Sequence, residues 1–330
     1  MSEKVAKEMR GDQRPNLPIS SSPQLLINAH TPLLAWYSQK RRALPWRQRP
    51  DPYGVLVSEF MLQQTQAERV APRFAAFLRQ FPGFAALAAA PTADVLRAWS
   101  GLGYNQRALR LQQIARAVVT QHGGGLPSGV AALRRLPGIG PYTAAAVACF
   151  AFGAQVATVD TNIRRVLQRL VAGGDADQAL TERQVWALAE QALPVGQAAD
   201  WNQALMDLGA AVCTARAPAC PRCPVAHLCR FRQEGRSDET RRPVVRRGGA
   251  GASRPFVGSS RYYRGRVLRV LTALAPGEDV PLPALGRQVK EGYATYDAGW
   301  LESVLTQLER DGLVALERDQ GEIKAHLPDG

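Results

Sequence analysis

Lysine is scarce in this chain of 330 residues, although the formal net charge is strongly positive. Lysine occurs at positions 4, 7, 40, 290 and 324, so nearly all of the 41 basic residues are arginine. A Schiff base requires the primary amine of a lysine. A reaction centre built from residues 41–289 therefore lacks a side chain that could form one.

Long hydrophobic runs are also absent. No stretch reaches the roughly 20 uninterrupted apolar residues that a membrane span requires, and residues 1–24 lack the apolar run of a signal peptide. We therefore expect a cytoplasmic protein. A hydrophobic content of 46% is typical of globular proteins, and the length suffices for roughly two domains.

The charge balance favours a polyanionic partner. The net charge is +13 and the isoelectric point is about 10.1, and basic side chains release counterions when they neutralise a phosphate backbone. Charge alone does not separate a nucleic acid from an acidic membrane surface.

Apolar residues recur at helical spacing through the first 230 residues, and Gly or Pro separates most of the segments. This pattern predicts an all-α domain of about ten short helices. Before it, residues 1–23 are expected to form a disordered arm, and after it the Arg/Gly/Ser/Pro-rich residues 233–258 read as a basic linker. The predicted helices cover residues 25–37, 55–81, 92–100, 107–122, 130–136, 141–152, 161–171, 182–193 and 201–213.

The C-terminal residues 259–330 have a different pattern. Helices are expected over 265–274, 282–290 and 297–311, followed by strands over 313–317 and 322–327. Three helices and a hairpin resemble a winged helix, which makes this an α+β domain. Such domains bind DNA or other proteins, and both roles stay open here.

A turn and an isolated acid stand out between Leu136 and Leu167. Gly138 and Gly140 bracket the apolar Ile139, so the backbone can turn with positive φ while Ile139 enters the core. The N–H groups of the following helix would then suit a phosphate, and Asp160 would add a carboxylate. The alternative is a loop between two core helices, with Asp160 as an N-cap.

Four of the five cysteines fall in one short segment with the spacing C-x6-C-x2-C-x5-C. Four thiolates this close repel one another unless a metal ion or an iron–sulfur core neutralises them. Zinc is a serious alternative to a cluster, and His227 could replace one ligand. We expect Arg216, Arg222 and Arg230 to surround the site, and Cys149 to be a small core residue. The expected ligands are Cys213, Cys220, Cys223 and Cys229.

Taken in order, LPGIGPYTAA, VDTNIRRVL and this cysteine spacing resemble the helix-hairpin-helix DNA glycosylases of the endonuclease III superfamily. The segments VSEFMLQQTQ, LPWR and WSGLGY are similar to the MutY-type adenine glycosylases. The resemblance covers residues 25 to 232. It implies a six-helix lobe over about 50–156, an iron–sulfur lobe from 24–49 and 157–232, and a [4Fe–4S] cluster on the four cysteines.

The resemblance also implies two carboxyl groups with different roles. Glu59 would protonate the adenine at N7, and its apolar helix face suits this role because apolar surroundings favour the protonated form of a carboxyl group. An exposed Glu at a helix edge is the alternative. Asp160 would stabilise the positive charge that develops on the deoxyribose, with Asn162 orienting the site. The family commonly has Gly where this chain has Thr161.

Tyr142 decides how far the reaction proceeds. Superfamily members that also nick the strand have a lysine at this position of the hairpin, whereas many MutY-type enzymes have a tyrosine. The resemblance therefore implies a monofunctional enzyme that releases the base and leaves an abasic site.

Excision requires the target base to leave the duplex, so other residues must fill the gap and hold the DNA. Gln64, Leu102 and Tyr104 match family residues beside the opposite base, and Arg47 with Trp46 matches the lining of the adenine pocket. Gly138 and Gly140 would contact the phosphate backbone.

The function implied is removal of adenine opposite 8-oxoguanine or guanine, by a monomer acting on double-stranded DNA of the nucleoid. Residues 259–330 do not resemble the Nudix-like domain that many relatives use to recognise 8-oxoguanine. We expect the linker and the winged helix to replace part of the DNA binding that this domain provides. A thymine/uracil mismatch glycosylase is a second interpretation, and a DNA-binding iron–sulfur regulator is a third.

Overall fold

The computed structural model describes residues 22–329 apart from 49, 175–179, 236–255 and 320. Residues 1–21 of the expected arm and most of the expected linker lie outside the described residues, whereas residues 22 and 23 of the expected arm already belong to the first helix. The chain forms two compact units, Met1–Ala43 with Ala148–Val245 and Leu44–Val147 with Arg246–Gly330. One boundary falls inside a helix, whereas the sequence suggests a boundary after residue 156.

The first unit is helical throughout its regular elements. The single helix expected over 25–37 is two helices, because the chain turns at the fully buried Ala29. The last turn before residue 173 is π-helical over Gln168–Ala172. The helices are α1 (Ser22–Asn28), α2 (His30–Lys40), α10 (Thr161–Leu167), α11 (Glu182–Gln191), α12 (Ala198–Ala211) and α13 (Arg230–Gln233).

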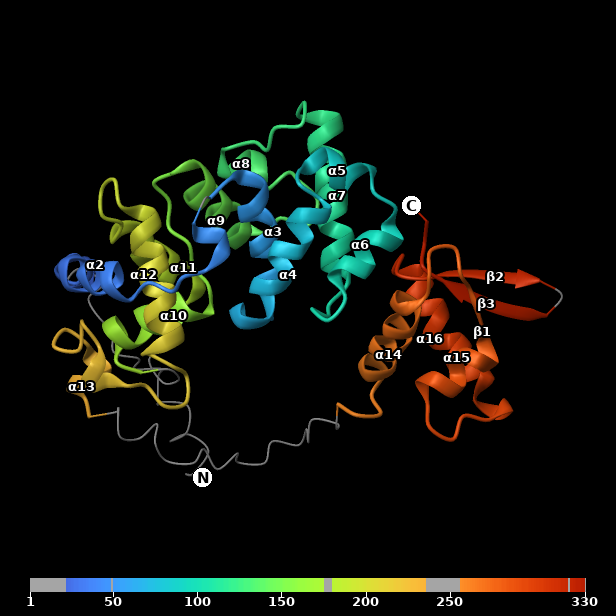
Figure 1. The fold of residues 1–330 in the computed structure, drawn as a ribbon. Helices are drawn as coiled ribbons and strands as arrows, with labels where there is room; N and C mark the ends of the chain where they lie inside the picture. The colour runs from blue at the N-terminus through green and yellow to red at the C-terminus, as the bar shows by residue number, and fades with distance from the viewer. Residues whose placement is uncertain (1–21, 49, 175–179, 236–255, 320, 330) are drawn as a thin grey trace, which may run out of the picture. The chain divides into compact units, whose positions relative to one another are not determined.

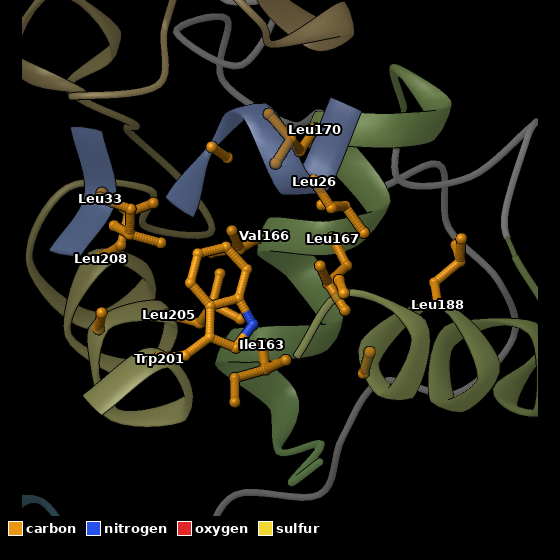
Figure 2. Packing of buried hydrophobic residues seen from close by; sticks show 14 of the residues in the cluster. Leu26, Leu33, Ile163, Val166, Leu167, Leu170, Leu188, Trp201, Leu205 and Leu208 are labelled. Carbon is orange, nitrogen blue, oxygen red and sulfur yellow. The ribbon is translucent and has the colours of Figure 1, made fainter. Parts of the chain in front are cut away.

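The core of the first unit forms around Trp201. Figure 2 shows its indole among Ile163, Val166 and Leu205, which come from α10 and α12. Trp201 is 1% exposed, and the His30 ring meets it edge-on at 4.7 Å between centroids. This packing fixes α10 and therefore the position of Asp160 at its N-terminus.

The second unit contains most of the remaining helices (Figure 1). Helix α9 crosses its boundary, since the two units divide between Val147 and Ala148. Helix α5, which packs against α7, was not expected from the sequence. The elements up to and including α9 are the 3-10 turn η2 (Pro45–Arg47), α3 (Pro52–Leu62), α4 (Ala67–Gln80), α5 (Phe84–Ala89), α6 (Thr92–Trp99), α7 (Gln106–Gln121), α8 (Val130–Leu133) and α9 (Pro141–Phe152).

The prediction of one continuous helix over 55–81 is wrong, because the segment forms two helices. It is divided into α3 and α4 by residues 63–66, where the backbone of Gln64 has a φ of +56°. A left-handed residue cannot continue a right-handed helix. Apolar spacing runs through this break, so periodicity alone could not reveal it.

The C-terminal part of the second unit combines three helices with a three-stranded antiparallel sheet (Figure 1). The strand order is β1-β3-β2, with Ala325 of β3 opposite both Val280 and Leu316. The short β1 was not expected from the sequence. The elements are α14 (Ser260–Ala273), β1 (Val280–Pro281), α15 (Leu282–Val289), α16 (Ala298–Arg310), β2 (Ala315–Asp319) and β3 (Glu322–His326).

Among the helices of the described residues, none combines the length and the hydrophobicity that crossing a bilayer requires.

Candidate active site and cluster site

The glycine turn after α8 depends on Gly138. Its φ is +76°, and a Cβ there would lie 3.1 Å from Cδ of Arg110 on α7. The positive φ therefore favours glycine, and the Arg110 side chain would have to move to admit a larger residue. Gly140 differs, because its φ is not positive and a Cβ would meet open space. Ile139 is buried at 6% exposure, as expected, and Tyr142 is half-buried in the first turn of α9.

Glu59 lies on α3, an apolar helix that is buried over most of its length. Asp51 caps the helix by accepting hydrogen bonds from the N–H groups of Tyr53 and Gly54, both at 3.0 Å. Every residue from Tyr53 to Met61 is buried, and Glu59 is 7% exposed. The alternative of an exposed Glu at a helix edge is therefore wrong.

The two residues expected to insert into the duplex share an unusual backbone. Gln64 and Tyr104, with φ of +56° and +48°, are the two non-glycine residues with positive φ in the described part of the chain. Such a conformation costs roughly 1–3 kcal/mol and persists where the surroundings enforce it. Both side chains are exposed. Leu102 lies differently, because its side chain is 4% exposed and supports the loop from inside.

Arg107 enforces both of these loops, and the sequence analysis did not identify it. Its side chain is 5% exposed. One end of the guanidinium, Nη1, donates to the carbonyl oxygens of Phe60 (2.8 Å), Met61 (2.9 Å) and Gln63, at the end of α3 and the start of the Gln64 loop.

The other end of the same guanidinium holds the Tyr104 loop. Nη2 donates to the carbonyl oxygens of Leu102 at 3.2 Å and Gly103 at 2.9 Å, and the guanidinium carbon lies 5.6 Å from the centroid of the Tyr104 ring. Burial lowers the pKa of Arg107 to about 10, so the group stays charged near neutral pH.

Arg47 belongs to a short turn that packs on the same unit. The η2 turn contacts α3 and α4, and the buried Trp46 meets Phe74 edge-on at 5.6 Å between ring centroids. Arg47 is half-buried after it.

In the first unit, Asp160 caps α10 and is held through both carboxylate oxygens. Oδ1 accepts a hydrogen bond from the N–H of Ile163 at 2.7 Å, and Oδ2 accepts one from Nδ2 of Asn162 at 2.8 Å. The N-cap interpretation is correct, and it also holds the carboxylate in one orientation. Thr161 is exposed, so the departure from Gly leaves Asp160 undisturbed.

Arg165 continues this hydrogen-bond chain toward the cysteines. Its Nη2 donates to Oδ1 of Asn162 at 2.8 Å and to the carbonyl oxygen of Gly209 at 2.7 Å, and its Nε donates to the carbonyl oxygen of Cys213 at 2.8 Å. Asp160 and the first cysteine are thus joined through two side chains.

The four cysteines line one hollow that encloses about 310 Å³, part of it open to solvent. The thiols surround this space and do not converge on a point: within the described residues, no three His, Cys, Asp or Glu side chains are close enough to hold a single metal ion. Four separate thiolates around a hollow suit a cluster, in which each binds a different iron.

The surroundings of the hollow suit an anionic group. Arg169 is 1% exposed, and its Nη1 lies 3.6 Å from Sγ of Cys213. Arg169 and Arg232 line the hollow, in place of the three arginines expected from the sequence. Burial raises the pKa of Cys223 to about 12 and that of Cys229 to about 11, so metal binding must displace protons from them.

His227 and Cys149 are not positioned to bind the cluster. His227 is exposed and is not among the residues that line the hollow. Cys149 is 1% exposed on α9 and accepts a hydrogen bond from Nδ2 of Asn202 at 3.4 Å, as a core residue would.

Two family models match the chain. Residues 57–191 match the HhH-GPD superfamily of base excision DNA repair proteins, and residues 213–229 match the iron–sulfur binding domain of endonuclease III. The second match spans the four cysteines, which therefore hold a [4Fe–4S] cluster, and the prediction of the cofactor is confirmed.

Several curated proteins are similar over long stretches. An adenine DNA glycosylase of Mycolicibacterium smegmatis is 42% identical over 87% of this chain and 92% of that protein. The human adenine DNA glycosylase is 44% identical over 61% of this chain, but only 39% of its own length is covered. A thymine/uracil-DNA glycosylase of Methanothermobacter thermautotrophicus is 36% identical over 60% of this chain and 90% of that protein.

The fold is similar to a solved structure as well. A thermostable thymine-DNA glycosylase superposes with a TM-score of 0.60 at 33% identity, and the match covers 65% of this chain and 98% of that one.

Removing one cluster cysteine tests the ligand assignment. We expect purified wild-type protein to contain about four iron atoms per chain, and Cys223→Ala to lose most of them because one iron loses its thiolate. Iron and zinc are measured by elemental analysis. Cys149→Ala is the matched control and should keep its iron. One zinc per chain, or equal iron loss in both variants, would contradict the assignment.

Removing the Arg107 guanidinium tests its role in the two loops. Arg107→Met leaves several buried carbonyl oxygens without a donor, and we expect the free energy of unfolding to fall by about 3 kcal/mol. The exposed Arg116 on the same helix is the control, and Arg116→Met should change stability by less than about 0.5 kcal/mol. Urea denaturation followed by circular dichroism measures both. Similar values for the two variants would rule out the role.

Proposed function

The chain belongs to the adenine DNA glycosylases of the HhH-GPD superfamily of base excision repair proteins, and from this we propose how it acts on its substrate. It is a hydrolase of N-glycosidic bonds in DNA. We propose that it removes adenine mispaired with 8-oxoguanine or guanine, as a monomer, after the adenine has been flipped out of the duplex.

The burial of Glu59 carries this proposal. A mispaired adenine leaves readily only when its ring is protonated, and the donor must hold a proton near neutral pH. Buried carboxyl groups in apolar surroundings can do so. Glu59 is the one acidic residue in the apolar helix α3, where it is 7% exposed. We assign it protonation of N7.

Asp160 is assigned the stabilisation of the developing sugar cation. A carboxylate held by Ile163 and Asn162 needs no reorganisation when positive charge appears nearby. Asn162 is a positioning residue in this proposal. When bound, the cluster ties the segment after α12 to α13 through four thiolate bonds, and it is assigned no chemical step.

The reaction is proposed to stop at the abasic site. A lyase step requires an amine that attacks the sugar, and the chain has no lysine between Lys40 and Lys290. Tyr142 occupies the corresponding position in the hairpin. Its phenol cannot form a Schiff base.

The DNA contacts are assigned to elements of the second unit. Gln64 and Tyr104 would occupy the space beside the opposite base, since both are exposed on loops held from below by Arg107. The Gly138 turn would contact phosphate, with Gly140 beside it. Arg47 would line the adenine pocket, and Leu102 would act only by supporting the loop.

We also assign the C-terminal elements to a winged-helix-like domain. The order α14, β1, α15, α16, β2, β3 and the antiparallel β1-β3-β2 sheet support this assignment. The third helix of such a domain commonly reads DNA bases, and α16 carries Glu302 and Glu309, of which Glu309 is paired with Arg318 at 2.9 Å. The C-terminal elements also make hydrogen bonds with Arg97, Gln106 and Tyr104 of the same unit, which supports a role in contacts within the protein.

A thymine/uracil mismatch glycosylase is the second candidate, favoured by the similarity to the proteins of that name described above. Such enzymes release a pyrimidine, which has no N7 to protonate. Glu59 therefore favours adenine.

Base release from three duplexes separates the candidates. We expect the wild type to release adenine opposite 8-oxoguanine much faster than thymine or uracil opposite guanine. Glu59→Gln should lower that rate by about 10²–10⁴-fold, and Asp160→Asn by about 10²–10³-fold, with duplex binding retained. Single-turnover release and binding are both measured. Faster release of thymine or uracil would overturn the assignment to adenine.

Trapping with borohydride tests where the reaction stops. Because no lysine lies near Tyr142 in the chain, we expect no reduced covalent adduct between enzyme and A:8-oxoguanine DNA. Tyr142→Lys is the matched comparison, since it restores the amine and should form an adduct. A high yield of adduct with the wild type would show that the enzyme also has lyase activity.

A further inference from the structure

Tyr104 is an exposed aromatic residue in a costly conformation. Its side chain is 47% exposed and its φ is +48°. The buried Arg107 holds the backbone of the loop from below and its guanidinium carbon lies 5.6 Å from the ring centroid, but its donors are directed to carbonyl oxygens and to the Thr65 hydroxyl. Another group must hold the phenol oxygen if the ring is to meet a base in a defined orientation.

Arg261 of α14 is that group. Its Nη1 donates a hydrogen bond to the phenol oxygen of Tyr104 at 3.2 Å, and its guanidinium carbon lies 5.9 Å from the ring centroid. Arg261 lies in the first turn of α14, which Ser259 caps by accepting a hydrogen bond from the N–H of Tyr262 at 3.2 Å. The two partners are separated by 157 positions in the chain.

The contact belongs to a wider attachment within the second unit. Nη2 of Arg97 donates to the carbonyl oxygen of Ala275 at 3.4 Å, and the side-chain amide of Gln106 donates to the carbonyl oxygen of Asp311. Arg97 is on α6 and Gln106 is on α7, so the C-terminal elements hold the helices on both sides of the Tyr104 loop.

We propose that Arg261 is a positioning residue for Tyr104, and that through it the C-terminal elements take part in recognising the base opposite the excised adenine. The inference rests on the proposed function. A ring fixed at its hydroxyl group and beside its face stacks against a base at a lower entropic cost than a free ring. The C-terminal elements thus contribute to discrimination through a contact within the protein.

Arg269 provides a matched control. It is exposed on the same helix and carries the same charge, but it lies two turns farther along, away from the hydrogen bond to Tyr104. Comparing Arg261→Ala with Arg269→Ala separates loss of the tyrosine contact from loss of general attraction to DNA. Thermal unfolding of both variants should match the wild type, since both side chains are exposed.

We expect Arg261→Ala to weaken binding of A:8-oxoguanine duplex about tenfold, and to narrow the difference in adenine release between A:8-oxoguanine and A:G. Arg269→Ala should change affinity less and leave that difference intact. In a Tyr104→Leu background, Arg261→Ala should have no further effect, because the residue through which it acts is gone.

Each other outcome overturns the inference. If Arg261→Ala and Arg269→Ala behave alike, the tyrosine contact has no role in recognition. If Arg261→Ala weakens binding equally with and without Tyr104, Arg261 acts on DNA directly and is not a positioning residue. If the wild type releases no adenine, the proposed function itself is overturned. That result comes from the wild type alone and does not depend on how the variants behave.

Discussion

The second unit depends on a single buried guanidinium group. Arg107 satisfies carbonyl oxygens from the end of α3, from the Gln64 loop and from the Tyr104 loop. Backbone carbonyls at the ends of helices need a donor when they are buried, and here one side chain serves two chain breaks. The two residues with positive φ keep this conformation because the hydrogen bonds from Arg107 to the carbonyl oxygens of their loops offset its cost.

In the first unit, a different set of contacts holds Asp160 and helix α10 in place. Asp160 is fixed at the start of α10, whose other face is buried around Trp201. Asn162 and Arg165 link this carboxylate to the carbonyl oxygen of Cys213. The seven-residue helix α10 is thus held by the Asp160 cap at its start, by packing along its buried face, and by the hydrogen bond from Arg165 to the cluster segment. Its position is set by packing, and the hydrogen bonds fix the orientation of the Asp160 carboxylate.

The sequence predicted what depends on local patterns. Most helices, the hairpin between β2 and β3, the capping role of Asp160 and the cluster cysteines follow from spacing and turn residues. It failed where tertiary contacts decide. The break at Gln64 lies inside an unbroken apolar pattern, and β1 is a two-residue strand that exists only because β3 pairs with it. Arg107 and Arg169 looked like any other arginines in an arginine-rich chain, because nothing local marks a side chain that will be buried.

Helix α7 carries both Arg107 and Arg110, less than one helical turn apart. The first holds the loops with the exposed Gln64 and Tyr104, and the second lies against Gly138 in the glycine turn. Along a helix axis three residues span about 4.5 Å. The helix therefore fixes the distance between the loops held by Arg107 and the glycine turn beside Arg110. In the proposed complex, neither the turn nor the loops of Gln64 and Tyr104 can shift along a duplex without the other.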